Sequence, residues 1–402
     1  MNPIDTAARP ATLAAWRRLA QVRPRLAALR PLGDCVRLPA RTLLHAGPPL
    51  ARPPCAPMLN SAVQAVLFEG WADTPEAAHA LIADGSVRLA AAQDHDCVVP
   101  LASVLSPGQQ VQVVQDASGM GRTAYAPLNG GSGPALRLGL PGPQVLAHLR
   151  WLNGPFAHAV RGVVPATRPL LSIADLALHQ GDDCHGRTAA GSRALLEDWR
   201  AAGLAADGEA ARFLADSPSF FLNLWMAAAK CMLSAAEGVA GSTLVTAMAG
   251  NGSQTGIQLA GLPGRWFTAA AAAPVGRIEP GRDVGDALPA IGDSALVETL
   301  GFGALAMQYA PAQREALGAY MPDTPERLCA RLLLAPHPAC TVSHVRVGLD
   351  AEAVLRHAQP PVVALGILDR KGMHGRIGGG IWQAPIAPFQ AALAALAPQP
   401  AP

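Results

Sequence analysis

The sequence has 402 residues, of which 50% are hydrophobic and 15% are charged, enough apolar chain for two or three domains with a large core. Its 31 basic and 29 acidic side chains nearly balance, which argues against a nucleic-acid-binding protein with a clustered basic face. No uninterrupted apolar run has membrane-spanning length, and the seven cysteines lack the paired spacing of a zinc ribbon or disulfide scaffold. We therefore expect a soluble protein of the cytoplasm.

Residues 1–145 alternate short apolar runs with glycine and proline, a pattern typical of a mixed sheet with helices. An arginine-rich amphipathic helix is expected at 12–29, in preference to a targeting peptide. A second helix is expected at 75–83, with Asp73 or Thr74 as its N-cap. Strands are expected at 63–68, 98–105 and at 111–114, which forms a hairpin with 123–126.

Residues 146–240 are mainly helical in pattern, and the β pattern returns over residues 241–402. Helices are expected at 145–152, 189–201, from Ser217-Pro218 onward, at 294–307 and at 390–397. Strands are expected at 244–248, 256–259, 265–268, 342–349 and 362–368, followed by a turn at 378–380. We therefore predict an α+β fold of three parts: an α/β domain at 1–145, a helical segment at 146–240 and an α/β domain at 241–402.

The densest polar cluster is HQGDDCHGR at residues 179–187. Read as a helix, it places Asp182 and His185 on one face. Its two histidines, two aspartates and one cysteine are residue types that ligate metals, but their spacing matches no standard zinc motif, so we expect no metal or other cofactor. Besides a metal site, which the spacing disfavours, two interpretations remain open. The cluster is an ion-paired helix end, or it is a substrate site with His185 as acid or base and Arg187 as an anion clamp.

Three glycine-rich elements, at 129–133, 251–256 and 376–380, offer backbone N–H groups of the kind that hold phosphate or carboxylate. None carries a P-loop or dinucleotide-binding pattern, so ATP and NAD are not supported. His45 and Glu69 lie beside turn-forming sequences, where a binding role and a capped turn are equally favoured. No GxSxG element is present, which disfavours a serine hydrolase.

Taken in order, several longer segments resemble the oxamate carbamoyltransferase subunit family (YlbE/AllG-like). The matching segments are LLHAGPP at 43–49, LFEGWA at 67–72, the AYAPLN stretch at 124–129, LRWL at 149–152, GDDCHGR at 181–187, FFLNLWMAAAK at 220–230, VTAMAGNG at 245–252, GLPGRWFTA at 261–269 and IGDSALVETLGFGALAM at 291–307. The match is collinear from about residue 40 to the C-terminus, which is more specific than any single motif.

The resemblance implies a transferase subunit of allantoin-type purine catabolism that acts beside FdrA-like and other carbamoyltransferase subunits. The implied reaction converts oxalurate and phosphate into oxamate and carbamoyl phosphate, or runs in reverse. Such chemistry needs anion clamps, an oxyanion site and a base. On these chemical grounds we assign a catalytic set of His185, Asp182 and Arg187, with Asp182 orienting the histidine. The small anionic substrate is expected to contact His45, Glu69, Asn129, Asn223, Asn251, Arg265 and Arg376.

Two departures from the family pattern affect the substrate. The family usually has a glutamate where Gly130 stands, and an arginine and a glutamate where Gly250 and Gln254 stand. A related ureido or amide acid therefore remains an alternative substrate. A non-catalytic scaffold subunit and a metal-assisted amidohydrolase built on residues 179–185 remain alternative functions. We expect stable association with at least one other subunit and leave homo-oligomerisation open.

Overall fold

The computed structural model describes residues 7–396, and its α+β architecture confirms the predicted fold class. The first third contains α1 (Pro10–Gln21), β1 (Pro24–Pro31), β2 (Thr42–His45), α2 (Ala56–Phe68), α3 (Pro75–Ala83), β3 (Arg88–Ala91), β4 (Val104–Leu105), β5 (Gln110–Asp116) and β6 (Ala124–Pro127). The helix expected at 12–29 was wrong in its second half, because proline lacks an N–H donor and Pro24 begins a strand. The strand expected at 63–68 was also wrong, since these residues form the end of α2.

The middle of the chain is helical, as its periodicity predicts. It contains α4 (Pro143–Trp151), α5 (Ala157–Val160), α6 (Leu170–His179), α7 (Ala189–Ala201), α8 (Glu209–Ala215) and α9 (Phe220–Ser234). Every residue of α9 except Leu222 is buried. A helix that is apolar on all sides belongs in the interior of a protein. Phe220, Trp225 and Met232 are fully buried in it and therefore serve core packing.

The last part of the chain contains many short elements. They are β7 (Val245–Asn251), β8 (Gln254–Leu259), β9 (Leu262–Ala270), β10 (Val275–Ile278), β11 (Ile291–Gly292), α10 (Ala295–Leu300), α11 (Pro311–Leu317), α12 (Pro325–Leu332), β12 (Leu333–Pro336), β13 (Arg346–Leu349), α13 (Ala351–Arg356), β14 (Val362–Leu368), β15 (Arg376–Gln383) and α14 (Ala387–Leu396). The turn expected at 378–380 was wrong, because these glycines lie inside β15.

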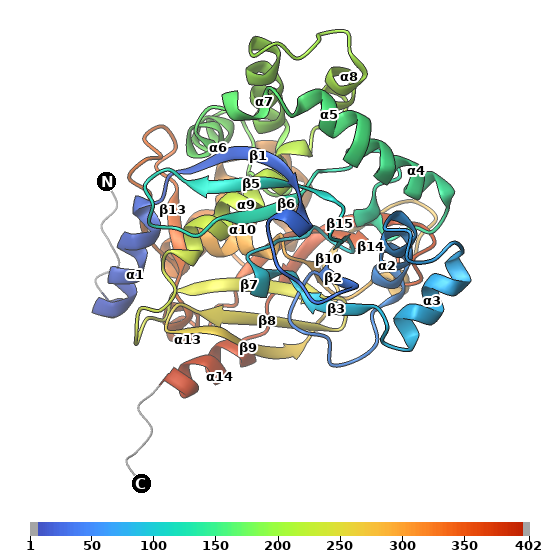
Figure 1. Cartoon of the computed structure of the whole chain (residues 1–402). Coiled ribbons are helices and arrows are strands. Elements are labelled where there is room, and N and C mark those ends of the chain that lie inside the picture. Colours follow the sequence, from blue (N-terminus) through green and yellow to red (C-terminus); the bar gives the residue numbers. More distant parts are fainter. Residues whose placement is uncertain (1–6, 397–402) are drawn as a thin grey trace.

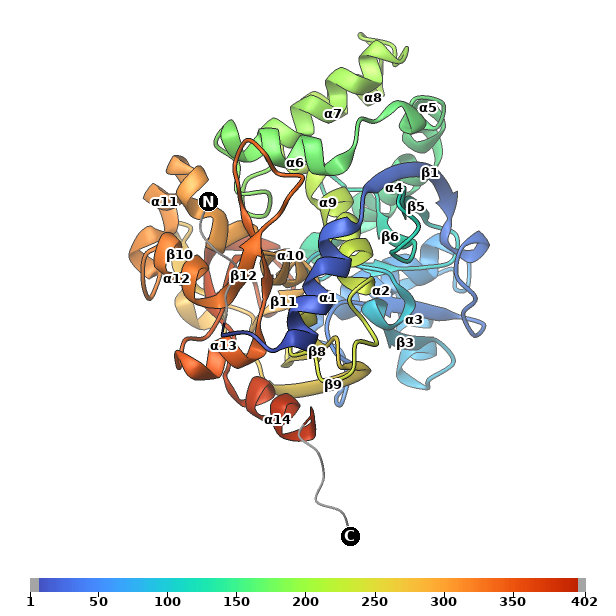
Figure 2. The same cartoon turned by 90° about the vertical axis from the view of Figure 1, so that its left-hand side faces the viewer.

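The strands form several small sheets instead of one large sheet (Figure 1). Their orders are β1-β5-β6, β3-β2-β4, β11-β7-β8-β9, β10-β15-β14 and β12-β13. Helix α9 packs against β1, β5, β6 and β7 and against α10, so it joins elements from all parts of the chain. Figure 2 shows α9 near the middle of the molecule, with α7 and α8 above it.

The first helix is hydrogen-bonded to residues of the last part of the chain. Thr12 in α1 shares a hydrogen bond of 2.8 Å with Thr243, and the indole of Trp16 donates to the carbonyl of Val347 at 3.1 Å. Within residues 7–396, no helix is both long and apolar enough to cross a bilayer. The division into three domains at residues 145 and 240 stays a prediction.

Candidate functional site

A cavity of about 820 Å³ lies among the loop after β6, the turn after α6, α11 and the sheet β10-β15-β14. The described residues around it include four arginines, Arg137, Arg187, Arg277 and Arg376, but one acidic side chain, Glu279. Guanidinium groups bind carboxylates and phosphates through paired N–H donors. The size and charge of this cavity therefore suit a small anion.

The turn after α6 carries two of the predicted residues to the wall of the cavity. Asp183 holds this turn, because its Oδ1 accepts the backbone N–H of His185 at 2.8 Å and of Arg187 at 2.9 Å. Cys184 has a φ of +60°, a conformation that is uncommon for residues other than glycine. The helical reading of this segment was wrong, since α6 ends at His179.

His185 is paired with a buried carboxylate from α10. Its Nδ1 lies 2.9 Å from Oε1 of Glu298, and this oxygen also accepts the backbone N–H of Ala304 at 2.9 Å and of Ala364 at 3.0 Å. Burial raises the pKa of Glu298, and the bond from His185 opposes this effect. Since Nδ1 is engaged, Nε2 is the ring nitrogen that remains for a ligand in the cavity.

Asp182 contacts Arg187 and the start of α7. One carboxylate oxygen accepts the backbone N–H of Gly191 at 3.0 Å, and the other lies 3.6 Å from Nε of Arg187. Burial raises the pKa of Asp182 to about 6. The structure thus places Glu298, instead of Asp182, on the ring nitrogen of His185. Asp182 is a partner of the predicted anion clamp.

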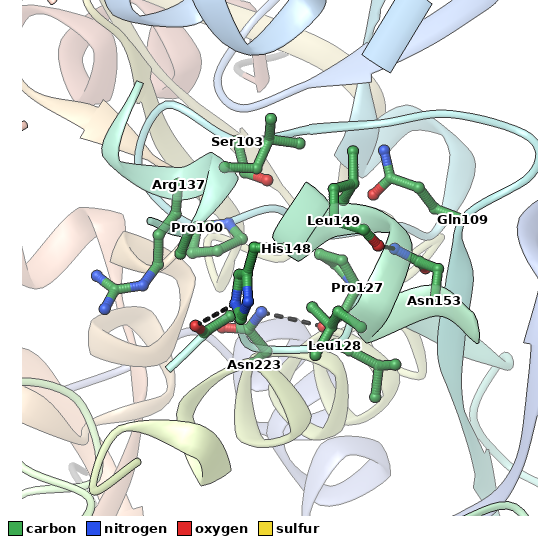
Figure 3. Close-up of a pocket in the computed structure, with 14 residues that line it drawn as sticks. Pro100, Ser103, Gln109, Pro127, Leu128, Arg137, His148, Leu149, Asn153 and Asn223 are labelled. Atoms are coloured by element: carbon green, nitrogen blue, oxygen red, sulfur yellow. Dashed lines mark hydrogen bonds between the residues drawn. The ribbon is translucent and has the colours of Figure 1, made fainter. Parts of the chain in front are cut away.

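Asn129 and Arg376 also line the cavity, whereas Asn223 lies behind it. The side-chain NH₂ of Asn129 donates to Oδ1 of Asn223 and to the carbonyl of Ser219, both at 3.0 Å. Both of its amide hydrogens are therefore already used. Asn223 borders a second, small cavity of about 20 Å³, shown in Figure 3, and donates to the carbonyl of Pro127 at 3.0 Å. These two asparagines fix the loop after β6.

The other four predicted residues are absent from the described wall of the large cavity. The ring of His45 is buried 2.7 Å from the carbonyl of Ala46, and burial lowers its pKa to about 4. Glu69 caps a loop by accepting from the hydroxyl of Ser106 at 2.5 Å. Asn251 accepts N–H groups within its own β-turn, and Arg265 lies 4.9 Å above the ring of Phe267.

The glycines of β15 allow strands to approach closely. A Cβ on Gly378 would lie 2.3 Å from the carbonyl oxygen of Arg277, and one on Gly276 would lie 2.1 Å from that of Gly379. Since β15 pairs with strands on both sides, its N–H groups are directed along the sheet. The expectation that this element is a free anion-binding loop was wrong.

Asp293 connects three segments beside the cavity. One of its oxygens accepts the N–H of Gly47 at 3.0 Å and the side-chain amide of Gln93 at 2.9 Å, and the other accepts the N–H of Val99 at 2.9 Å. Burial raises the pKa of Asp293 to about 7. The cavity is lined by Ser294, which follows Asp293, and by Pro100, which follows Val99. This carboxyl group therefore positions the wall without being part of it.

The comparisons with known proteins agree on one family. The model of the family described as oxamate carbamoyltransferase subunit AllG matches residues 87–294. Oxamate carbamoyltransferase subunit AllG of Escherichia coli K12 is 33% identical over 375 residues, 89% of each chain. The chain belongs to the AllG family. The uncharacterized protein YahG of the same organism is 32% identical and covers 88% of this chain, with 78% of its own length matched.

A solved structure has the same fold. The crystal structure of a conserved protein of unknown function from Enterococcus faecalis V583 superposes with a TM-score of 0.88, covers 96% of each chain and is 30% identical. The AllG family model spans Asn129, Arg137, His185 and Arg187, whereas Arg376 lies beyond the matched range. The cavity is therefore built partly from the family-model region and partly from the chain that follows it.

Sequence reasoning missed Arg137, Arg277 and Glu298. Each is a single polar residue in a short or apolar segment, and only the folded chain brings it to the others. Glu298 alone carried a local signal, as the one acidic residue within the apolar stretch 295–307. No group of three or more potential metal ligands occurs among residues 7–396.

Proposed function

We propose that this chain is a carbamoyltransferase subunit that binds oxamate-type substrates in the arginine-lined cavity. The observation that carries the proposal is the meeting of four arginines with the buried His185–Glu298 pair at one cavity. The family membership supports the subunit role, because the matching relative is named as an oxamate carbamoyltransferase subunit. The cytoplasm is the proposed location.

The proposed reaction transfers a carbamoyl group between nitrogen and oxygen. An oxygen of hydrogen phosphate attacks the terminal ureido carbonyl carbon of oxalurate, forming a C–O bond and a tetrahedral centre. The bond from that carbon to the inner nitrogen then breaks. The proton lost by phosphate is transferred to this nitrogen, which gives carbamoyl phosphate and oxamate. In the reverse direction, a base removes a proton from the oxamate nitrogen as it attacks.

His185 is the proposed proton carrier and Arg187 the proposed carboxylate clamp. A histidine whose Nδ1 is held by a carboxylate has a fixed ring and a free Nε2, the arrangement used for acid–base transfer. Arg187 follows two residues later, held by the same Asp183 turn, and presents a planar fork of donors. A related ureido acid would use the same groups if it carried a carboxylate.

Reconstitution tests this proposal. The chain is co-expressed with an FdrA-like subunit and a further carbamoyltransferase subunit, and phosphate release from carbamoyl phosphate plus oxamate is measured. We expect His185→Gln to reduce turnover about 100- to 10,000-fold, in line with the loss of a general acid or base. The matched control is His158→Gln, since His158 is exposed on α5. Full activity of the His185→Gln complex would instead identify a scaffold subunit.

Assays of the same reconstituted complexes identify the substrate. Oxamate is replaced by other small amide and ureido acids at equal concentration, each with carbamoyl phosphate or phosphate as the second substrate. We expect carboxylate-bearing acceptors to be used and their uncharged amides to be rejected, since an amide lacks the negative charge that the paired donors of an arginine bind. Equal use of both kinds would contradict the proposed clamp.

A further inference from the structure

We propose that Arg137 and Arg376 form a subsite for a phosphate dianion, either free phosphate or the phosphoryl group of carbamoyl phosphate. This inference rests on the proposed function and specifies which arginines of the cavity receive which group. Arg137 follows β6 in the loop that Asn129 and Asn223 hold, and Arg376 begins β15, so two distant segments contribute one cation each.

Neither of these arginines has a carboxylate partner within residues 7–396. Arg137 donates from Nη2 to the carbonyl of Gly131 at 2.9 Å, and its buried Nε has no hydrogen-bond partner in this part of the chain. Arg376 donates from Nε to the carbonyl of Gly378 at 2.9 Å. Each guanidinium is thus oriented by one backbone carbonyl while its remaining N–H groups are left for a ligand.

The two cations also affect one another. Burial, together with the positive charge of Arg376, lowers the pKa of Arg137 to about 10. Arg376 is exposed, whereas Nε of Arg137 is buried, and two like charges held close together are unfavourable without a counter-ion. A bound dianion neutralises both charges, whereas a monoanion leaves one uncompensated. The pair therefore favours phosphate over a single carboxylate.

The surroundings leave room for this ligand on the cavity side. A Cβ on Gly379 would lie 3.4 Å from Nη2 of Arg376, so glycine keeps that side of the guanidinium open. Figure 3 shows the guanidinium of Arg137 directed away from His148 and Asn223, while the stem of the side chain borders the small cavity. Arg376 is carried by a strand and Arg137 by a loop that is held by hydrogen bonds of Asn129, so the positions of their N–H donors are fixed.

Arg187 differs from this pair in its local charge. Its Nε lies 3.6 Å from a carboxylate oxygen of Asp182, so the local charge is close to balanced when Asp182 is ionised. A balanced pair has less electrostatic attraction for a dianion than two unpaired arginines have. The arginines therefore sort the ligands, with the oxamate carboxylate at Arg187 and phosphate at Arg137 and Arg376.

Direct binding to the full-length chain, in its complex where it co-purifies as one, tests the subsite without turnover. Inorganic phosphate and oxamate are titrated separately by calorimetry at constant ionic strength. We expect Arg376→Gln and Arg137→Lys to weaken phosphate binding about ten- to a hundredfold, the loss typical of charge-assisted hydrogen bonds, and to leave oxamate binding within about twofold. The control is Arg150→Gln, because Arg150 is exposed on α4.

The outcomes separate this inference from the proposed function. If wild-type protein binds no phosphate, or if Arg376→Gln binds it normally, the subsite is overturned. If phosphate binding depends on both arginines but the complex transfers no carbamoyl group, the subsite stands and the proposed reaction fails. If the complex is active and the phosphate KM is unchanged in Arg376→Gln, the reaction stands and the subsite fails. Arg376→Gln alone decides the case if Arg137→Lys does not fold.

Discussion

At the scale of single residues, a substitution of Arg187 tests whether the turn after α6 is a functional site or only an ion-paired turn. The side chain of Arg187 is 46% exposed, so a lysine fits there and keeps the charge. We expect Arg187→Lys to lower kcat/KM of the reconstituted complex about 30- to 1,000-fold, since losing a two-pronged contact to a desolvated anion costs roughly 2–4 kcal/mol. The melting temperature should stay within about 2 °C of wild type.

The matched control for this prediction is Arg193→Lys. Arg193 lies on α7 nearby and donates to Gln180 from an exposed position, so its replacement should leave kcat/KM unchanged. An Arg187→Lys enzyme with near-normal turnover, or with an activity loss that follows its melting temperature, would return Arg187 to a structural role.

Asp182 gives a prediction about pH. Because burial raises the pKa of Asp182 to about 6 in the folded protein from its ordinary value of 3.8, folding favours the protonated carboxyl group. The folded state then binds more protons than the unfolded state between about pH 4 and pH 6, so stability contributed by this group falls as the pH rises through that window and is constant above it.

The comparison with Asp182→Asn isolates this effect. We expect the free energy of urea unfolding of wild type, relative to Asp182→Asn, to decrease by about 1–3 kcal/mol from pH 4 to pH 6.5. A relative stability that instead rises over this range would show that pairing with Arg187 outweighs the burial of Asp182.

At the scale of elements, the cavity wall depends on how closely β10 approaches β15. A Cβ on Gly276 would lie 2.1 Å from the carbonyl oxygen of Gly379 and 2.2 Å from Cα of Gly380, so alanine there forces the strands apart. We expect Gly276→Ala to lower the free energy of unfolding by roughly 1–3 kcal/mol and to reduce activity, because β10 carries Arg277.

Gly162→Ala is the control for that substitution. A Cβ at Gly162 meets no atom within 4 Å, so its unfolding free energy should change by less than about 0.5 kcal/mol. Equal stability of the Gly276 and Gly162 variants in urea would show that the strands can separate at little cost.

The elements also show what the sequence could predict. Helices α3 and α7 and strand β14 have the predicted ends, because a Thr74 cap, an amphipathic period and a bounded apolar run are local signals. By composition, the apolar residues 63–68 suit either a strand or a helix. They are the end of α2, which begins at Ala56, so the preceding residues are needed to recognise the helix. His185 and Arg187 were found because polar residues cluster there. The salt-bridge partner Glu298 is 113 residues away from His185, a separation that no local pattern encodes.

At the scale of the whole molecule, the family membership predicts an assembly. We expect the chain to elute with at least one further carbamoyltransferase subunit when the two are co-expressed, at the summed mass in light scattering. The physical reason is the composition of the chain, which is 50% hydrophobic and rich in alanine. Such a composition favours an apolar surface that another subunit covers. A monodisperse chain with full carbamoyl-transfer activity on its own would contradict this.

The carboxyl group of Asp293 also has a consequence for synthesis on the ribosome. Its hydrogen bonds to Val99 and Gly47 span 194 and 246 residues, so both donors emerge long before their acceptor. At about 5–20 residues per second, translation of the 194 intervening residues takes roughly 10–40 s. During that interval the backbone N–H groups of Gly47 and Val99 lack their native acceptor. Chaperones and proteases therefore meet an N-terminal part in which these two hydrogen bonds form only after residue 293 has left the exit tunnel.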